Sequence, residues 1–305
     1  MDPIREKILK PSKETRQDFV GKTLSYASIF LIVGVVLAIF LFVASKGIAT
    51  FTQNKASLVE FLTGSEWNPG ANGPNGRPLV VALPMILGSF GVTLLAALFA
   101  TPFAIGTALY MTELSSKRSQ KFMQSVIELL VGIPSVVYGF IGLTVVVPFV
   151  RDHFGGSGYG ILSGSFVLFV MVLPTITSMT VDSLRAVPKY YKSASLALGA
   201  TEWQTIYRVL LRAALPGIMT AIVFGMARAF GEALAVQMVI GNATLLPESL
   251  LAPASTLTSV LTMGIGNTVM GTVSNNALWS LALVLLLMSL FFNIAVRFIS
   301  RKGKM

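Results

Sequence analysis

The chain has 305 residues, of which 54% are hydrophobic and only 12% are charged. Soluble domains carry about 25% charged residues, so this composition, with a mean hydropathy of +0.75, indicates a membrane protein. The net charge of +10 lies in short blocks between apolar segments, which argues against a nucleic-acid partner because no contiguous basic domain exists. Cysteine is absent, which excludes disulfides and thiolate metal sites. The sequence predicts no bound metal and no cofactor.

The first membrane-spanning segment is expected at 24–45, after a basic tail over 1–23. This segment is uncharged and reaches the length of about 20 residues that a helix needs to cross the hydrocarbon of a bilayer. The following segment, 46–84, holds many turn-forming residues. It predicts a small excursion outside the membrane with a short helix near 57–62.

Five further crossings are expected in the rest of the chain, from Leu83 to 112 and at 122–150, 161–181, 215–241 and 277–296. The predicted fold class is therefore all-α: a polytopic membrane protein with six transmembrane helices in a domain over 24–299, followed by a tail over 300–305. Basic residues gather in both tails and in the loops after the second and fourth crossings. The positive-inside rule then places both termini in the cytoplasm.

The third expected crossing contains a proline, Pro134, and one acid, Glu128. Proline removes a helical hydrogen bond, so a kink is predicted there. Ser135 and the freed carbonyl groups are candidates to face a transport pathway, together with Glu128. The alternative is a packing kink with an acid that reaches water near the end of the helix.

The loop over 183–213 is too long for a tight turn. A helix is predicted at 190–198, ended by Gly199, and Thr201 with Gln204 predicts a capping box at the start of a second helix. A short helix with small residues on one face suits insertion into the groove of a partner. The alternative is an ordinary amphipathic loop in the cytoplasm.

The fifth expected crossing contains Arg228 and Glu232. Residues four apart share one face of a helix, and charges within a membrane span normally face a bundle interior or a pathway because burying them is costly. The planar arginine side chain suits phosphate-like oxyanions. A role in the pathway or its gate is one hypothesis, and a structural ion pair that only fixes helix packing is the other.

The loop resembles the one by which permeases of ATP-binding-cassette (ABC) importers dock onto their ATPase. That pattern is Glu-Ala-Ala, three residues, Gly, nine residues, Ile-x-Leu-Pro. Here 193–195 read Ser-Ala-Ser, Gly199 matches the glycine, and 209–212 read Val-Leu-Leu-Arg. The resemblance implies that a separate ATPase contacts Ser193, Ala194, Ser195, Gly199 and Ala200. No Gly-x-x-x-x-Gly-Lys-Ser/Thr nucleotide-binding motif occurs in this chain.

Three further motifs resemble the phosphate-specific importer permeases: Ile-Pro-Ser-Val-Val-Tyr-Gly at 133–139, Arg-Ala-Phe-Gly-Glu at 228–232 and Ala-Leu-Gly-Ala-Thr at 197–201. The basic N-terminal tail and the sequences at 66–69 and 238–242 resemble the C-type subunit (PstC) family. The resemblance implies a MetI-like ABC importer permease fold in a bacterial or archaeal cell (inner) membrane. It also implies three protein partners: an A-type sister permease, a dimer of cytoplasmic ATP-binding subunits and an extracytoplasmic phosphate-binding protein.

The predicted function is therefore transport of inorganic phosphate by a subunit that is not itself an enzyme. Two alternatives stay open. The first is a permease for another oxyanion, such as molybdate or sulfate. The second is an ion-coupled secondary transporter in which Arg228 and Glu232 form a proton relay.

Overall fold

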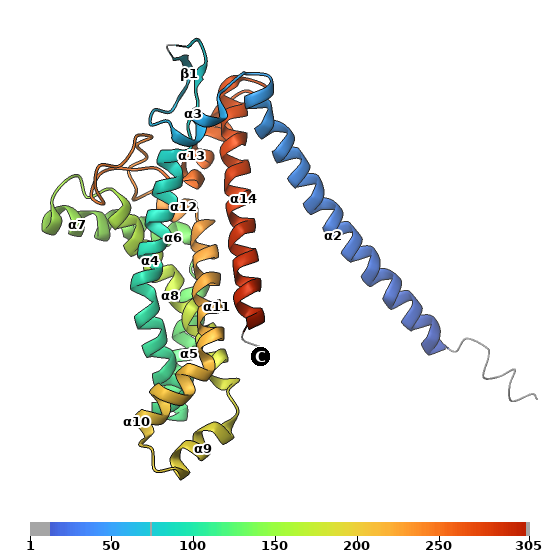
Figure 1. Ribbon diagram of the computed structural model, residues 1–305, viewed down its shortest axis with the longest axis vertical. Helices are drawn as coiled ribbons and strands as arrows, with labels where there is room; N and C mark the ends of the chain where they lie inside the picture. The colour runs from blue at the N-terminus through green and yellow to red at the C-terminus, as the bar shows by residue number, and fades with distance from the viewer. Residues whose placement is uncertain (1–12, 74, 303–305) are drawn as a thin grey trace, which may run out of the picture. The chain divides into compact units, whose positions relative to one another are not determined.

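The computed structural model describes residues 13–73 and 75–302, so parts of the two predicted tails, 1–12 and 303–305, lie outside the described residues. The chain divides into two compact units, one ending at Lys46 and one beginning at Gly47, which are described separately. Helix α2 (Lys13–Thr52) forms the first unit and enters the second (Figure 1).

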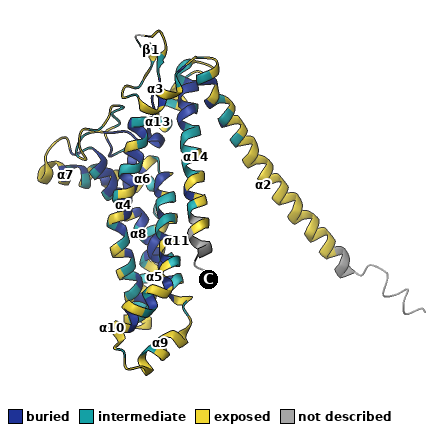
Figure 2. Cartoon of the chain, in the orientation of Figure 1, coloured by how far each residue is buried: buried dark blue, intermediate teal, exposed yellow. Residues whose placement is uncertain are grey.

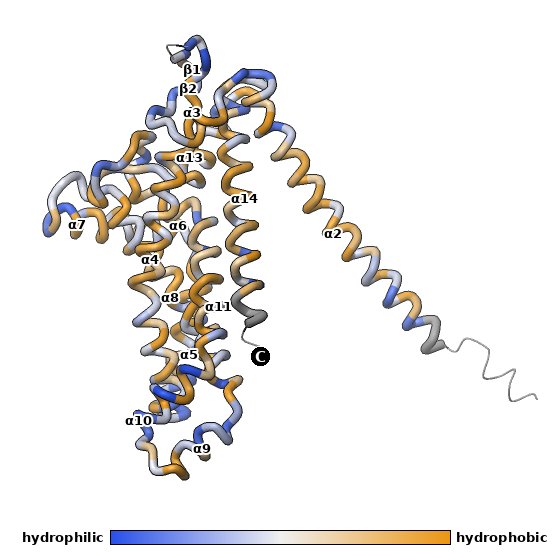
Figure 3. The backbone as a smooth tube through the Cα atoms, viewed as in Figure 1, coloured by the Kyte–Doolittle hydropathy of each residue, from blue (hydrophilic) through white to orange (hydrophobic). Residues whose placement is uncertain are grey.

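Six helical segments of the described chain are long and apolar enough to cross a membrane: Gln17–Thr52, Leu83–Leu114, Ser135–Phe154, Ile161–Arg185, Glu202–Phe230 and Val273–Ala295. Figure 3 shows apolar residues along most of the length of the long helices. The predicted all-α class with six membrane-length helices is confirmed. The third and fifth segments depart most from the expected bounds.

Helix α8 (Ile161–Arg185) is the centre of the second unit and packs against α4 (Leu83–Leu109) and α11 (Leu211–Phe230). Most of its residues are buried, as Figure 2 shows. Fully buried alanines at 96, 100 and 104 give α4 a small-residue face in the same apolar cluster as α8. Small side chains let membrane helices approach closely and gain packing energy. On its other side, α11 packs against α14 (Val273–Lys302).

The segment before α14 folds into the short helix α13 (Leu257–Gly264), followed by the 3-10 turn η4 (Ile265–Asn267). Its first residue is fully buried, and the N–H of Leu257 donates to the Ser89 hydroxyl of α4 at 3.0 Å. Just before it, the Ser255 carbonyl oxygen lies where a Cβ on Gly88 would be, only 2.1 Å away. A glycine is therefore needed at position 88 for the chain at Ser255 to pass so close to α4.

The segment over 46–84 contains the predicted short helix, α3 (Leu58–Thr63), which begins after the N-cap Ser57. A two-stranded antiparallel hairpin, β1 (Asn68–Asn72) with β2 (Pro78–Leu79), follows it and was not predicted. Phe61 is only 2% exposed and anchors this region in a cluster with Val80 and Ala82. The hairpin lies at the opposite end of the second unit from the loop between α8 and α11 (Figure 1).

The C-terminal turns of α2 are fixed to α14 by buried hydrogen bonds. The Ser280 hydroxyl lies 2.7 Å from both the Gly47 carbonyl oxygen and the Thr50 hydroxyl. The Asn276 amide donates to the Asn54 amide oxygen at 2.9 Å. Polar side chains thus join the first and last helices of this unit where small residues bring them close.

Candidate functional site

The predicted third crossing, over 122–150, is interrupted by a break in the helix. Helix α5 (Lys117–Gly132) ends before Ile133, and α6 (Ser135–Ile141) begins after Pro134. It continues through the π-helical turn η2 (Gly142–Val146) into α7 (Val147–Phe154). The expectation of one kinked crossing over 122–150 is therefore wrong. Proline disfavours helical geometry in the preceding residue, and Ile133 is extended with ψ 128°.

One side chain compensates for the backbone hydrogen bond lost at this break. In a continuous helix the carbonyl of Leu130 would accept the N–H of residue 134, but proline has no N–H. The hydroxyl of Tyr138 donates to that carbonyl instead, at 2.7 Å. Tyr138 is buried, and an unsatisfied carbonyl beside it would be costly. The break is thereby stabilised from within α6.

Glu128 and Ser135 lie on different helices, one on each side of the break. Glu128 is exposed on α5 and accepts a hydrogen bond from the Gln124 amide at 2.9 Å. It lines a pocket of about 630 Å³ together with Gly132 and Pro134. Ser135 is half-buried and is the first residue of α6. Their role as pathway residues stays a prediction.

Arg228 and Glu232 do not share one helical face, because α11 ends at Phe230. Glu232 lies in the connection to the short helix α12 (Leu234–Gln237), where its carboxylate accepts the Ala235 N–H at 3.3 Å. The expectation of one continuous helix over both residues is thus wrong. Within the described residues, ion pairs join only Lys22 to Asp18, Arg151 to Asp152 and Lys192 to Glu113. The structural ion pair is therefore not formed.

Arg228 is held by a neutral partner. Its Nη1 donates a hydrogen bond to the hydroxyl of Thr175 on α8. Thr175 is only 9% exposed, whereas Arg228 is exposed. A hydroxyl fixes the guanidinium without cancelling its charge, and an arginine has five N–H donors. The remaining donors are available for an oxyanion. Sequence reasoning missed Thr175, because it is one of many hydroxyl residues in its crossing.

The loop over 183–213 has the helix–turn–helix form that the sequence predicts. Helix α9 (Lys189–Ala197) ends before Gly199, whose φ of +84° favours glycine. The capping box is present: the Thr201 hydroxyl accepts the Gln204 N–H at 3.2 Å, and the Gln204 side chain accepts the Thr201 N–H at 3.0 Å. It opens α10 (Glu202–Thr205), which continues through the π-helical turn η3 (Ile206–Leu210) into α11.

Most side chains of this loop are exposed. No residue of α9 is buried, and Ser193, Ala194 and Gly199 are exposed. Leu198 is 89% exposed at the turn. Ser195 and Ala200 are half-buried. The Ser195 hydroxyl lies 2.9 Å from that of Thr205, which ties the two helices together. The result is a fixed hairpin of helices with apolar and small side chains facing outward.

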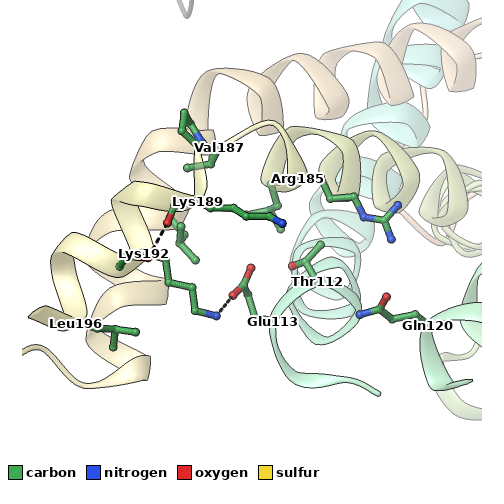
Figure 4. A pocket seen from close by; sticks show the side chains of 12 residues that line it. Thr112, Glu113, Gln120, Arg185, Val187, Lys189, Lys192 and Leu196 are labelled. Carbon is green, nitrogen blue, oxygen red and sulfur yellow. Dashed lines mark hydrogen bonds and ion pairs between the residues drawn. The ribbon is translucent and has the colours of Figure 1, made fainter. Parts of the chain in front are cut away.

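An ion pair joins this loop to the end of the second crossing. The Lys192 ammonium lies 2.6 Å from the carboxylate of Glu113, in the π-helical turn η1 (Tyr110–Leu114) that follows α4 (Figure 4). This ion pair lies beside a pocket of about 550 Å³ between α8, α9 and α5. In the described part of the chain no cluster of three or more His, Cys, Asp or Glu side chains could hold a metal.

Comparison with known proteins gives concordant matches. Residues 100–304 match the family model "Binding-protein-dependent transport system inner membrane component". The chain is 48% identical over 303 residues to a probable ABC transporter permease protein, YqgH, from Bacillus subtilis, covering 99% of this chain and 97% of that protein. It is 32% identical to the phosphate transport system permease protein PstC from Xylella fastidiosa, covering 83% and 82% of the two chains.

Solved structures share the fold. A chain of a bacterial ABC transporter involved in the import of the acidic polysaccharide alginate superposes with a TM-score of 0.62 at 18% identity, covering 94% of this chain and all of that one. A chain of the MetNI methionine ABC transporter in an inward-facing conformation gives 0.55 at 20% identity, covering 72% and 94%. At these identities the likeness concerns the fold alone, which is that of MetI-type ABC transporter permeases.

Proposed function

Because the chain belongs to the family of binding-protein-dependent transport system inner membrane components, it is a multi-pass ABC importer permease and not an enzyme, and we propose that its cargo is inorganic phosphate. The relatives named as phosphate permeases include PstC proteins from Xylella fastidiosa and Mycobacterium tuberculosis, each 32% identical. We place the chain in the C-type subunit family, with an A-type sister permease completing the pathway.

The observation that carries the phosphate proposal is the uncompensated charge of Arg228. A cation in a membrane-spanning helix is costly unless it is hydrated or paired, and here a neutral hydroxyl, Thr175, holds it. A passing dianion would supply the missing countercharge, and the guanidinium fork matches the oxygens of a phosphate group. Glu232, in the next connection, would then limit how tightly the anion binds. Glu128 and Ser135 are proposed as further pathway residues at the break before α6.

The energy source proposed is a dimer of cytoplasmic ATP-binding subunits that docks on the loop over 183–213. The exposed Ser193, Ala194 and Gly199, with Ser195 and Ala200 behind them, form the proposed contact. With this loop inside the cell, both termini are cytoplasmic and the hairpin β1–β2 faces outward. An extracytoplasmic phosphate-binding protein would deliver the cargo there. A related alginate transporter was solved with a periplasmic protein that carries its substrate.

The test is uptake by the complete transporter reconstituted in vesicles with its sister permease, ATPase and binding protein. Uptake of radiolabelled phosphate should need internal ATP, persist with a proton uncoupler and resist competition by sulfate or molybdate. Equal uptake of sulfate or molybdate would favour the permease for another oxyanion. Loss of uptake with the uncoupler while ATP remains would favour the ion-coupled alternative and contradict the proposal.

A further inference from the structure

The pocket beneath the loop carries positive charge that no carboxylate of the described chain neutralises. Four charged side chains line it: Arg185, Lys189, Lys192 and Glu113. Lys192 and Glu113 neutralise each other at 2.6 Å. Arg185 and Lys189 form no ion pair with any described residue. The pocket therefore keeps two uncompensated cations.

The walls of this pocket are held in place by independent contacts. The Glu113 side chain is only 14% exposed, and its pairing with Lys192 fixes α9 against η1. Buried Leu184 and Leu210 contribute an apolar lining. Figure 4 shows Lys189 and Arg185 extending from α9 and α8 toward Thr112 and Gln120 on the opposite side. The concavity is thus built from residues within 112–120 and 184–196, together with Leu210.

A neutral donor also reaches the pocket. The Nε2 atom of Gln120 donates to the Ser115 carbonyl oxygen at 3.4 Å. A side-chain amide has two N–H groups, so one of them is left for a ligand. The hydroxyl of Thr112 is already used, because it donates to the Ala108 carbonyl oxygen at 3.0 Å. Besides Lys192, which is paired with Glu113, the available donors are therefore one guanidinium, one ammonium and one amide.

We propose that this pocket binds a phosphoryl group, with Arg185 and Lys189 as its cationic ligands and Gln120 as a neutral donor. The guanidinium fork fits two oxygens of such a group, and the ammonium and amide are further donors that line the same pocket. A planar carboxylate has only two oxygens and would leave part of this donor set unused. The site uses residues other than Arg228, so it does not depend on the identity of the cargo.

Two sources can supply the phosphoryl group: the headgroup of an anionic phospholipid, and free inorganic phosphate. Basic residues at a membrane surface attract anionic lipids, and the volume of about 550 Å³ accommodates either. A bound anion would also remove the repulsion between Arg185 and Lys189, which flank the turn at 186–188 between α8 and α9. It would thereby hold the exposed loop in its observed position.

The test uses the purified full chain carrying Arg228→Gln, so that the proposed pathway cation does not contribute to binding. The chain is exchanged into phosphatidylcholine or into phosphatidylglycerol, and the retained lipid is measured by native mass spectrometry. Binding of radiolabelled inorganic phosphate is measured in parallel. Arg185→Gln with Lys189→Gln is compared with Lys117→Gln and Arg118→Gln, which remove the same charges from exposed positions outside the pocket.

Loss of two charge-assisted hydrogen bonds should weaken binding about tenfold or more in Arg185→Gln/Lys189→Gln. The Lys117→Gln/Arg118→Gln control should bind as the parent does. If the pocket variant loses only phosphatidylglycerol, the site binds a lipid headgroup. If it loses only inorganic phosphate, the site binds the free anion. Two results would overturn the proposal: no binding by the parent chain, or unchanged binding by the pocket variant.

Discussion

The guanidinium group of Arg228 on α11 donates a hydrogen bond to the hydroxyl of Thr175 on α8. The contact joins two central helices of the second unit and leaves the positive charge of the arginine in place. A carboxylate in the position of Thr175 would have cancelled that charge. Arg228 therefore keeps the charge that its proposed role in anion transport requires.

The first prediction concerns that charge. Arg228→Gln keeps a side chain that can donate to Thr175 but removes the cation, so it should assemble normally and lose phosphate uptake by at least about tenfold. The double variant Arg228→Glu/Glu232→Arg should be equally inactive. The two residues do not form an ion pair, so there is no attraction for the exchange to preserve. Uptake is measured in reconstituted vesicles. Full activity of the exchanged protein would contradict a pathway role for Arg228.

The second prediction concerns Ala194, which is exposed on α9. Because the position is exposed, Ala194→Trp should fold but block the proposed docking of the ATPase. ATP hydrolysis would then no longer respond to the loaded binding protein. Tyr190→Trp, also at an exposed α9 position, is the control for added bulk alone. Normal uptake by Ala194→Trp would contradict the docking assignment.

The third prediction separates backbone conformation from side-chain bulk at Gly199. Its φ is +84°, and a Cβ added there meets nothing within 4 Å. Side chains other than glycine cost about 1–2 kcal/mol in left-handed geometry, with asparagine better tolerated than β-branched residues. Gly199→Val should therefore reduce the ATP hydrolysis that the loaded binding protein stimulates in the complete transporter more than Gly199→Asn does. Equal loss in both variants would point to contact with the partner rather than strain.

The fourth prediction concerns two glycines on α4. A Cβ on Gly88 would lie 2.1 Å from the Ser255 carbonyl oxygen, whereas one on Gly106 meets nothing within 4 Å. Gly88→Ala should destabilise the chain by about 1–3 kcal/mol through overpacking. Gly106→Ala should stabilise it by up to about 1 kcal/mol, since alanine is the better helix former. Thermal unfolding of the purified chain measures both, and a lower Tm for Gly106→Ala would refute the comparison.

The fifth prediction tests orientation. The chain has no cysteine, so single cysteines can be introduced without background at the exposed positions Asn72, His153 and Glu202. A membrane-impermeant thiol reagent should label positions 72 and 153 in intact cells and label position 202 only after lysis. Labelling of position 202 in intact cells would reverse the proposed topology.

Local features of the fold could be predicted from the sequence, and tertiary ones could not. The Gly199 turn and the Thr201–Gln204 capping box depend on residues a few positions apart, and the structure confirms both. At Pro134 the sequence predicts a kink and the structure has a break, because a proline can either kink a helix or end it. The partner of Arg228 comes from a different crossing, Thr175, and no local pattern encodes that contact.

The hydrogen bond from Tyr138 to the Leu130 carbonyl makes residues 134 and 138 epistatic. With proline at 134, Tyr138→Phe deletes the hydroxyl that donates to the Leu130 carbonyl. With alanine at 134, a backbone N–H becomes available and the same substitution loses most of its cost. The effect of a mutation at one position thus depends on the residue at the other. Natural variants of this protein are therefore expected to change residues 134 and 138 together.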